Sequence, residues 1–245
     1  MSEKIWYLKR SDLFRQLASH ELAELELRCR SRNFPRKSPI YLPADEADAV
    51  LLLARGKVKI CHLTPDGKQA ILAFIEPGEL FGELALLQPN EREEYAEAVD
   101  PSLVILIPRQ EIERLMERHP GLSLGITKLI GLRRQRIERR LKYLLFRSNR
   151  DRLVHLLLEL AEQYGMPEEG GVGLRVRLSH QDLANIIGST RETVTVLLGE
   201  LQQEGLVSLG RKRIVIQNVR GLAESVNTTP PPMPAPTPSQ LPAST

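Results

Sequence analysis

The stretch that decides the fold is residues 178–194, LSHQDLANIIGSTRETV. Its first half places apolar residues at helical spacing, and Ser179 stands three residues before Asp182, as in a capping box. Gly188 then permits a tight turn before a second helical pattern. Two short helices joined by a glycine-containing turn are typical of a helix-turn-helix unit.

Ser189 is predicted to cap the second helix, because Ser189 and Glu192 repeat the capping-box spacing. The expected core-facing side chains are Val194, Leu197, Leu198 and Leu201. Glu192, Thr195, Val196 and Gly199 fall on the opposite face, with Arg191 at its flank. Arginine can bind guanine bidentately, and glutamate can accept from the cytosine amino group. A hairpin with a basic tip over 205–216 fits a wing that lies on phosphate. Each residue alone is better explained as a cap or a solvated charge, but the set predicts DNA binding.

The charge distribution supports a polyanionic partner. The chain has 245 residues and a net charge of +3. Residues 1–127 carry a net charge of −3, whereas residues 128–220 carry +7. The basic half contains the helix-turn-helix, so double-stranded DNA is the expected partner rather than a membrane surface.

The first half has the pattern of an antiparallel β domain. Short apolar or alternating segments recur about every ten residues, which favours a barrel or sandwich. Arg55-Gly56 is interpreted as a hairpin-like break and 64–67 as a turn. The strands are expected at 39–43, 50–53, 58–63, 70–75, 95–99 and 103–107.

A long helical pattern follows the β domain, without glycine or proline from Leu132 to Tyr164 and with a break expected at Ser148-Asn149. It is followed by a loop over 165–173. Part of the helical pattern has heptad spacing, which predicts a helix that pairs with a second copy, although packing on its own domain is an alternative. The expected dimer contacts are Ile130, Ile137, Leu141 and Leu144.

Composition removes other classes of protein. Cys29 and Cys61 suit a reducing, cytoplasmic location and are too few for an iron–sulfur cluster or a four-cysteine zinc site. No apolar run is long enough to span a bilayer, and no signal peptide is evident. No motif for catalysis is present, so an enzyme is not expected.

With these motifs, the chain resembles the CRP/FNR family of bacterial transcription regulators. The resemblance rests on Arg191-Glu192-Thr193-Val194 and on residues 77–86, PGELFGELAL, and runs from about Leu13 to Val219. It implies a homodimer with an effector pocket, a palindromic operator and contact with RNA polymerase. The implied fold is α+β: an N-terminal antiparallel β-roll of the jelly-roll type (1–119), a dimerisation helix (120–148), a winged helix-turn-helix (149–220) and a disordered proline-rich tail (221–245).

The resemblance assigns base reading to Arg191 and Glu192, whereas the third base-reading position of the family, often arginine, is Val196 here. Ser179 and Gln181 match positions that contact phosphate. A protein that regulates through protein partners, with DNA binding lost, is the alternative that Val196 suggests. The residues expected at DNA are Ser179, Gln181, Ser189, Thr190, Arg191, Glu192, Thr195, Val196, Arg211, Lys212 and Arg213.

The effector pocket departs from the cyclic-nucleotide pattern. Gly82 and Glu83 match the ribose-binding part and Arg92 the phosphate-binding arginine, but Glu93 and Glu94 replace the small hydroxyl residue and its neighbour. A carboxylate beside a phosphate is unfavourable, so a cyclic nucleotide is disfavoured against a 2-oxoglutarate-like effector or none. Haem ligation by Cys61, His62 or His119 is also disfavoured. The expected pocket residues are Gly82, Glu83, Leu84, Arg92, Ile137 and Glu138.

Overall fold

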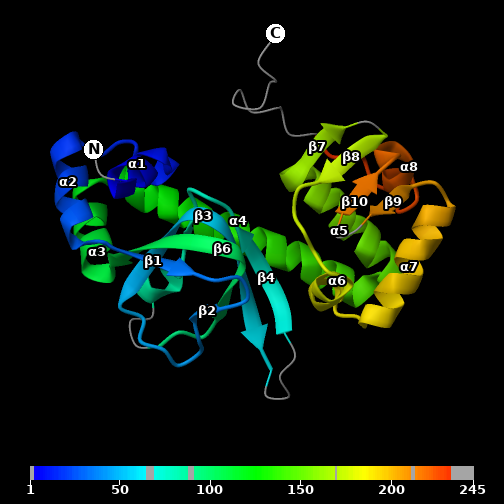
Figure 1. Ribbon diagram of the computed structural model, residues 1–245, viewed down its shortest axis with the longest axis horizontal. Coiled ribbons are helices and arrows are strands. Elements are labelled where there is room, and N and C mark those ends of the chain that lie inside the picture. Colours follow the sequence, from blue (N-terminus) through cyan, green and yellow to red (C-terminus); the bar gives the residue numbers. More distant parts are fainter. Residues whose placement is uncertain (1–2, 65–68, 88–90, 169, 211–212, 233–245) are drawn as a thin grey trace, which may run out of the picture. The chain divides into compact units, whose positions relative to one another are not determined.

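The computed structural model describes residues 3–64, 69–87, 91–168, 170–210 and 213–232, except for the side chains of Glu3, Arg140, Tyr143, Leu144 and Phe146. The chain divides into two compact units, residues 1–137 and 138–245 (Figure 1). Unit 1 holds α1 (Glu3–Arg10), η1 (Asp12–Phe14), α2 (Ser19–Arg28), β1 (Arg30–Phe34), β2 (Pro39–Tyr41), β3 (Ala49–Leu63), β4 (Gln69–Ile75), β5 (Leu80–Phe81), η2 (Glu83–Leu86), β6 (Tyr95–Pro108), α3 (Arg109–Arg118) and most of α4 (Pro120–Phe146).

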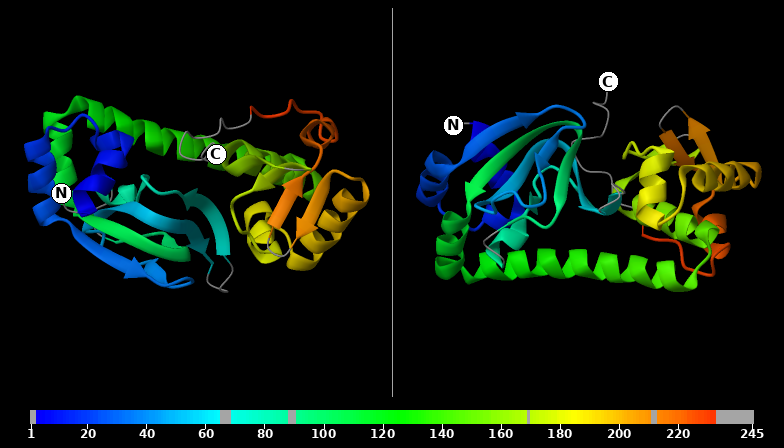
Figure 2. Two further views of the ribbon diagram at one scale, coloured as in Figure 1. Left: turned by 45° about the horizontal axis from the view of Figure 1, so that its top comes forward. Right: turned by 90° about the horizontal axis from the view of Figure 1, so that it is seen from below.

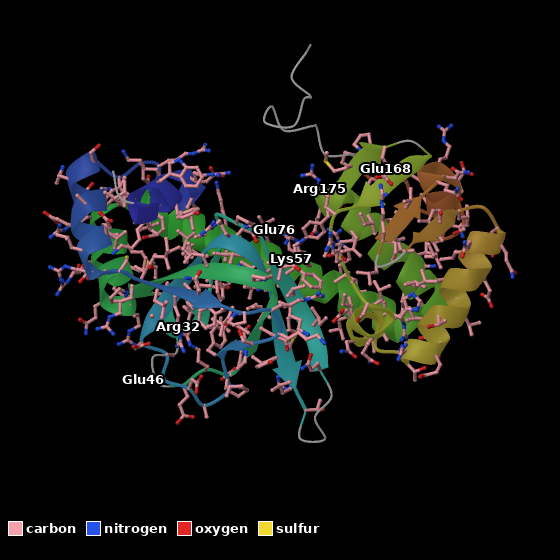
Figure 3. All side chains as sticks on the ribbon, in the orientation of Figure 1. Arg32, Glu46, Lys57, Glu76, Glu168 and Arg175 are labelled. Atoms are coloured by element: carbon pink, nitrogen blue, oxygen red, sulfur yellow. The ribbon has the colours of Figure 1, made fainter. Side chains whose placement is uncertain are left out.

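Unit 1 is built on one antiparallel sheet in the order β1-β6-β3-β4, with β2 paired to β6 and β5 paired to β3. The predicted β-roll is therefore confirmed, and β1 is an additional strand that the sequence pattern did not predict. Lys57 of β3 and Glu76, which follows β4, form a 2.7 Å ion pair (both are labelled in Figure 3).

The predicted hairpin-like break at Arg55-Gly56 is wrong. β3 is one strand of 15 residues that bulges there, and the two segments expected at 95–99 and 103–107 are likewise one strand, β6. Gly56 has φ +94°, and a Cβ there would lie 2.3 Å from Ser102 Oγ. A glycine in the left-handed region lets the strand bulge and continue, rather than turn back.

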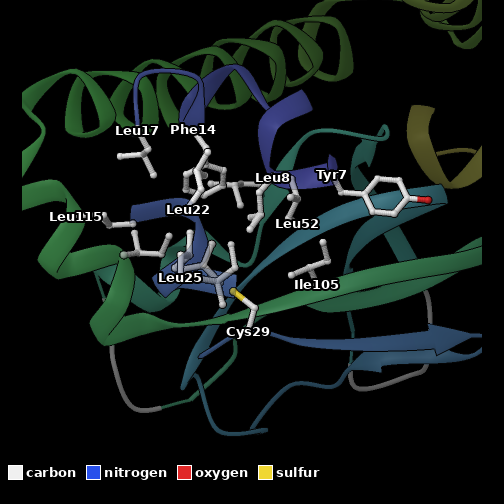
Figure 4. Close-up of a cluster of buried hydrophobic side chains, with 14 of the residues drawn as sticks. Tyr7, Leu8, Phe14, Leu17, Leu22, Leu25, Cys29, Leu52, Ile105 and Leu115 are labelled. Atoms are coloured by element: carbon white, nitrogen blue, oxygen red, sulfur yellow. The ribbon is translucent and has the colours of Figure 1, made fainter. Parts of the chain in front are cut away.

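Two apolar clusters hold unit 1 together. One lies within the roll, and the other joins the roll to its helices (Figure 4). In the second cluster, Phe14, Leu22 and Leu25 of the N-terminal helices pack with Ile105 of β6. Leu122 of α4 is fully buried in the same cluster, so the start of α4 is anchored on the roll.

The break predicted at Ser148-Asn149 is confirmed, because α4 ends at Phe146 and α5 (Asn149–Tyr164) begins after Ser148. The Ser148 hydroxyl caps α5 by accepting a 3.1 Å hydrogen bond from Asp151 N. Figure 2 shows α4 as one continuous helix. Hence the first part of α4 belongs to unit 1 and its end to unit 2.

Unit 2 combines helices with a small antiparallel sheet in the order β7-β8-β10-β9. The loop predicted over 165–173 is wrong, because β7 and β8 pair there as a hairpin. Besides α5 and the end of α4, the elements are β7 (Gly165–Glu168), β8 (Gly171–Leu174), α6 (His180–Ile187), α7 (Arg191–Gln203), β9 (Val207–Gly210), β10 (Arg213–Ile216) and α8 (Val219–Glu224).

The prediction that a disordered tail begins at residue 221 is also wrong. Residues 219–224 form α8, whose Asn218 cap accepts a 2.8 Å hydrogen bond from Gly221 N. Leu222, Ala223 and Val226 are buried, which a composition-based prediction of a tail from residue 221 overlooks. Residues 233–245 of that tail lie outside the described part of the chain.

Candidate nucleic-acid interface and effector pocket

Helix α6 begins and ends as the sequence predicts. Ser179 Oγ accepts from Asp182 N at 3.1 Å, and Asp182 Oδ2 accepts from Ser179 N at 2.9 Å, which completes the capping box. Gly188 follows with φ +65°, the left-handed conformation that ends the helix, and Ser189 N donates to the carbonyl of Ala184. The chain is thereby turned directly into α7.

The cap of α7 differs from the prediction. Thr190, not Ser189, is the N-cap, and its hydroxyl accepts a 3.2 Å hydrogen bond from Thr193 N. The helix therefore starts at Arg191, one residue later than predicted. The side chains of Arg191 and Glu192 are exposed and form no hydrogen bond or ion pair with any other described residue. Both polar groups are free for an external partner.

The two faces of α7 separate as predicted. Val194, Leu198 and Leu201 are fully buried, and α7 packs against α6 and α5. On the opposite face, Val196 is 61% exposed. The Thr195 hydroxyl is already engaged, since it donates to the carbonyl of Arg191 at 2.9 Å and lies 2.8 Å from His180 Nδ1.

Strands β9 and β10 form the predicted wing hairpin. Next to its tip, where it is opposite Gly210, exposed Arg213 forms an ion pair with Glu168 at the end of β7 (Figure 3 labels Glu168). Arg211 and Lys212, the expected basic tip, lie outside the described residues. Gln181, the other expected phosphate contact, is exposed and donates to Asn185 at 2.8 Å.

In unit 1, the structure brings Gly82, Glu83, Leu84 and Arg92 together. Arg92 is buried, donates to the carbonyls of Gly82 at 3.0 Å and Ala49 at 2.5 Å, and lies over the ring of Tyr41 at 4.6 Å. The alternative of an ion pair from Arg92 to a neighbouring glutamate is therefore not what the structure has. Arg92 Nε is buried and makes no hydrogen bond within the described structure.

Glu83 is also engaged by its own chain. Arg133 of α4 donates to the Glu83 carboxylate at 2.5 Å and to the carbonyl of Leu80. Sequence reasoning missed Arg133 and Tyr41. No local spacing points to Arg133, because it lies 50 residues from Glu83.

The cavity beside these residues is small. Gly82, Leu84 and Arg92 line it with Glu93 and Glu94, and its volume is about 10 Å³. Burial raises the pKa of the Glu94 carboxyl, and the Glu83 carboxylate raises it further. Tyr41 donates to Glu94 at 3.3 Å.

Ile137, another expected pocket residue, is not among the residues that line this cavity, and Glu138 belongs to unit 2.

The expected dimer residues on α4 differ in their surroundings. Ile130 is partly buried against the core of the roll, so part of its side chain is covered within its own unit. Ile137 is 41% exposed and Leu141 is 52% exposed, and the side chain of Leu144 is outside the described part. Leu145 is 65% exposed and was not predicted. The second half of α4 therefore presents apolar side chains to solvent.

The residues considered for haem differ in their surroundings. Cys61 is fully buried, whereas His62 is exposed. His119 Nε2 lies 2.7 Å from the Glu21 carboxylate.

Each of the two units matches a known domain family. Residues 31–119 match the cyclic nucleotide-binding domain and residues 151–225 match the Crp-like helix-turn-helix domain. The chain is 33% identical to the global nitrogen regulator of Synechocystis sp. over 193 residues, which cover 78% of this chain and 86% of that protein. It is 32% identical to the cyclic AMP receptor protein of Thermus thermophilus over 217 residues, 89% of this chain and 97% of that one.

A solved structure has the same fold. The crystal structure of a CRP-family transcriptional regulator from Thermus thermophilus superimposes with a TM-score of 0.68 at 28% identity, covering 81% of this chain and 98% of the other. A cyclic nucleotide-binding domain followed by a Crp-like helix-turn-helix domain defines a class of transcription regulators. The chain belongs to the CRP/FNR family of transcriptional regulators. Within the described residues, no helix combines the length and the apolar character needed to cross a membrane.

Proposed function

We propose that the protein is a homodimeric transcription regulator that binds a palindromic operator and contacts RNA polymerase. The observation that carries the proposal is the start of α7, where the Arg191 and Glu192 side chains are exposed and unengaged within the described structure. The other DNA contacts expected from sequence, from Ser179 to Arg213, belong to the same proposal. Dimeric helix-turn-helix proteins bind two half-sites about 34 Å apart, one turn of DNA, and the exposed apolar residues of α4 support pairing into such a dimer.

Selection of binding sites from random duplexes tests this function. We expect recovery of a palindrome with half-sites one helical turn apart. Arg191→Ala should lower specific affinity by about 1–3 kcal/mol and relax one guanine position, because its bidentate contact is lost. Recovery of no palindrome, or an equal loss for every sequence, would contradict it. In that case, regulation through protein partners becomes the better explanation.

For the effector, we propose that the protein responds either to a small anion other than a cyclic nucleotide or to no effector. Small-molecule sites usually have volumes of roughly 300–1,000 Å³, far above the cavity of about 10 Å³ beside Arg92. Two nitrogens of Arg92 already donate to backbone carbonyls, and Glu83 is paired with Arg133. The unsatisfied Nε of Arg92 supports an acceptor such as a carboxylate. The closed cavity equally supports a regulator that binds DNA without an effector.

A thermal-shift panel with cyclic AMP, 2-oxoglutarate and haem separates these options. A ligand that binds only the folded state raises the melting temperature as its concentration exceeds its Kd. We expect a rise with 2-oxoglutarate or with none of the three. A large rise with cyclic AMP would overturn the interpretation of Glu93 and Glu94.

A further inference from the structure

Unit 1 contains a second and larger groove, with a volume of about 550 Å³. Its walls are residues 10–16, the turn 77–80 and one face of α4 between Gly121 and Arg136. It contains none of Gly82, Glu83, Leu84 or Arg92, so it is distinct from the pocket beside Arg92. Its volume lies within the range typical of small-molecule sites.

The groove carries an excess of positive charge. Five of its lining residues are Lys or Arg and two are acidic. Asp12 is already paired with Arg15 at 3.0 Å, and the Glu79 carboxylate accepts from Glu76 N at 2.9 Å. The side chains of Lys128 and Arg136 have no hydrogen bond or ion pair with other described residues. Two cations of the groove are therefore available to an external anion.

An apolar surface lies between these two cations. Lys128, Leu132 and Arg136 follow one another at four-residue spacing, which places them on the same face of α4. Leu132 is 56% exposed, so its apolar surface is accessible from the groove. Leu13 and Leu129 line the same groove. The surface suits a ligand with both an apolar part and a negative charge.

A buried hydroxyl supports a ligand at this place. Ser11 lines the groove, is only 1% exposed, and its Oγ has no hydrogen-bond partner among the described atoms. Buried polar groups are nearly always satisfied, and one that is not calls for an explanation such as an absent bound group. A polar atom of a ligand that reaches the floor of the groove would satisfy it.

We propose that this groove binds an organic anion with an alkyl or acyl chain. Lys128 and Arg136 hold the carboxylate or phosphate group, and Leu132 and its apolar neighbours cover the chain. Arg133 also lines the groove while it pairs with Glu83. Arg133 therefore contacts both the groove and the Glu83 carboxylate.

Calorimetric titration of the full-length protein with sodium decanoate tests the proposal, with butyrate and decan-1-ol as comparison probes. The variant Lys128→Gln/Arg136→Gln removes the two free cations. The matched control, Arg118→Gln/Arg139→Gln, removes two exposed cations that do not line the groove. We expect saturable binding of decanoate, about tenfold weaker binding in the groove variant and less than about a twofold change in the control. Butyrate and decan-1-ol should bind more weakly than decanoate.

Three results would overturn the proposal. The first is the absence of saturable decanoate binding, and the second is an equal loss of decanoate affinity in the control variant. The third is decan-1-ol binding as tightly as decanoate, with no loss of affinity when the two cations are removed. If decanoate does not bind and sedimentation shows that the groove variant alters dimerisation, a second copy covers the groove instead. Circular dichroism checks the folding of each variant, and Lys128→Gln alone, at an exposed position, replaces a double variant that does not fold. None of these measurements depends on DNA binding.

Discussion

Arg133 Nη1 donates to the Glu83 carboxylate at 2.5 Å, and Arg133 Nη2 donates to the carbonyl of Leu80. The contact ties α4 to the segment that carries the family's effector motif. Both side chains are largely buried, with 16% and 9% of their surface exposed. A buried pair differs from a surface pair, because removal of one partner leaves the other charge uncompensated.

We therefore expect Arg133→Gln to lower the free energy of unfolding by about 3 kcal/mol, measured by urea denaturation. The control Arg139→Gln, on the same helix but exposed, should change stability by less than about 0.5 kcal/mol. The double variant Glu83→Gln/Arg133→Gln should recover part of the loss, because no buried charge remains. Equal midpoints for Arg133→Gln and wild type would show that the pair does not stabilise the roll.

Val196 is exposed on α7, at the third base-reading position that the family resemblance assigns and that is often arginine in the family. Val196→Arg should add a guanine preference at one position of each half-site, worth about 1–3 kcal/mol against other bases. Competition binding with half-site variants measures it. Gln202→Arg, exposed near the end of α7, is the control and should strengthen binding to all sequences alike. If Val196→Arg also acts uniformly, position 196 does not face the bases.

Glu94 should make the stability of the roll depend on pH. Burial, and then the Glu83 carboxylate, raise the pKa of Glu94 in the folded protein. The charged form is thus disfavoured by folding, and this penalty declines as pH falls through the folded pKa toward the unfolded value. Glu94→Gln should raise the melting temperature at pH 7.5, with the advantage lost near about pH 4. Exposed Glu93→Gln is the control, and the same rise in both variants would contradict the role of burial.

Gly56 should tolerate no side chain. Its φ of +94° and the approach of Ser102 Oγ to within 2.3 Å of a Cβ position leave neither the conformation nor the space. We expect Gly56→Ala to lower the free energy of unfolding by about 2–4 kcal/mol. Gly131→Ala, where nothing lies within 4 Å, is the control and should be neutral or slightly stabilising. Equal stability of the two variants would mean that the bulge adapts.

The sequence by itself determined the helix-turn-helix, since its caps, its turn glycine and its apolar faces depend on residues within a few positions of one another. The Ser179–Asp182 capping box, Gly188 and the buried face of α7 are therefore found as predicted. The strand pattern likewise determined an antiparallel β domain. A glycine such as Gly56 has the same local pattern in a turn and in a bulge, so only the pairing of β3 with β6 showed which it is.

Only the tertiary structure decided what surrounds each charged side chain. Arg92 satisfies backbone carbonyls and Glu83 pairs with a residue 50 positions away. Lys128 and Arg136, by contrast, remain unengaged in a groove assembled from three separate segments. Hydrogen bonds and ion pairs act over a few ångströms in space and are independent of distance along the chain. For that reason, residue types and spacing could predict the class of regulator, but not which charges its fold leaves free.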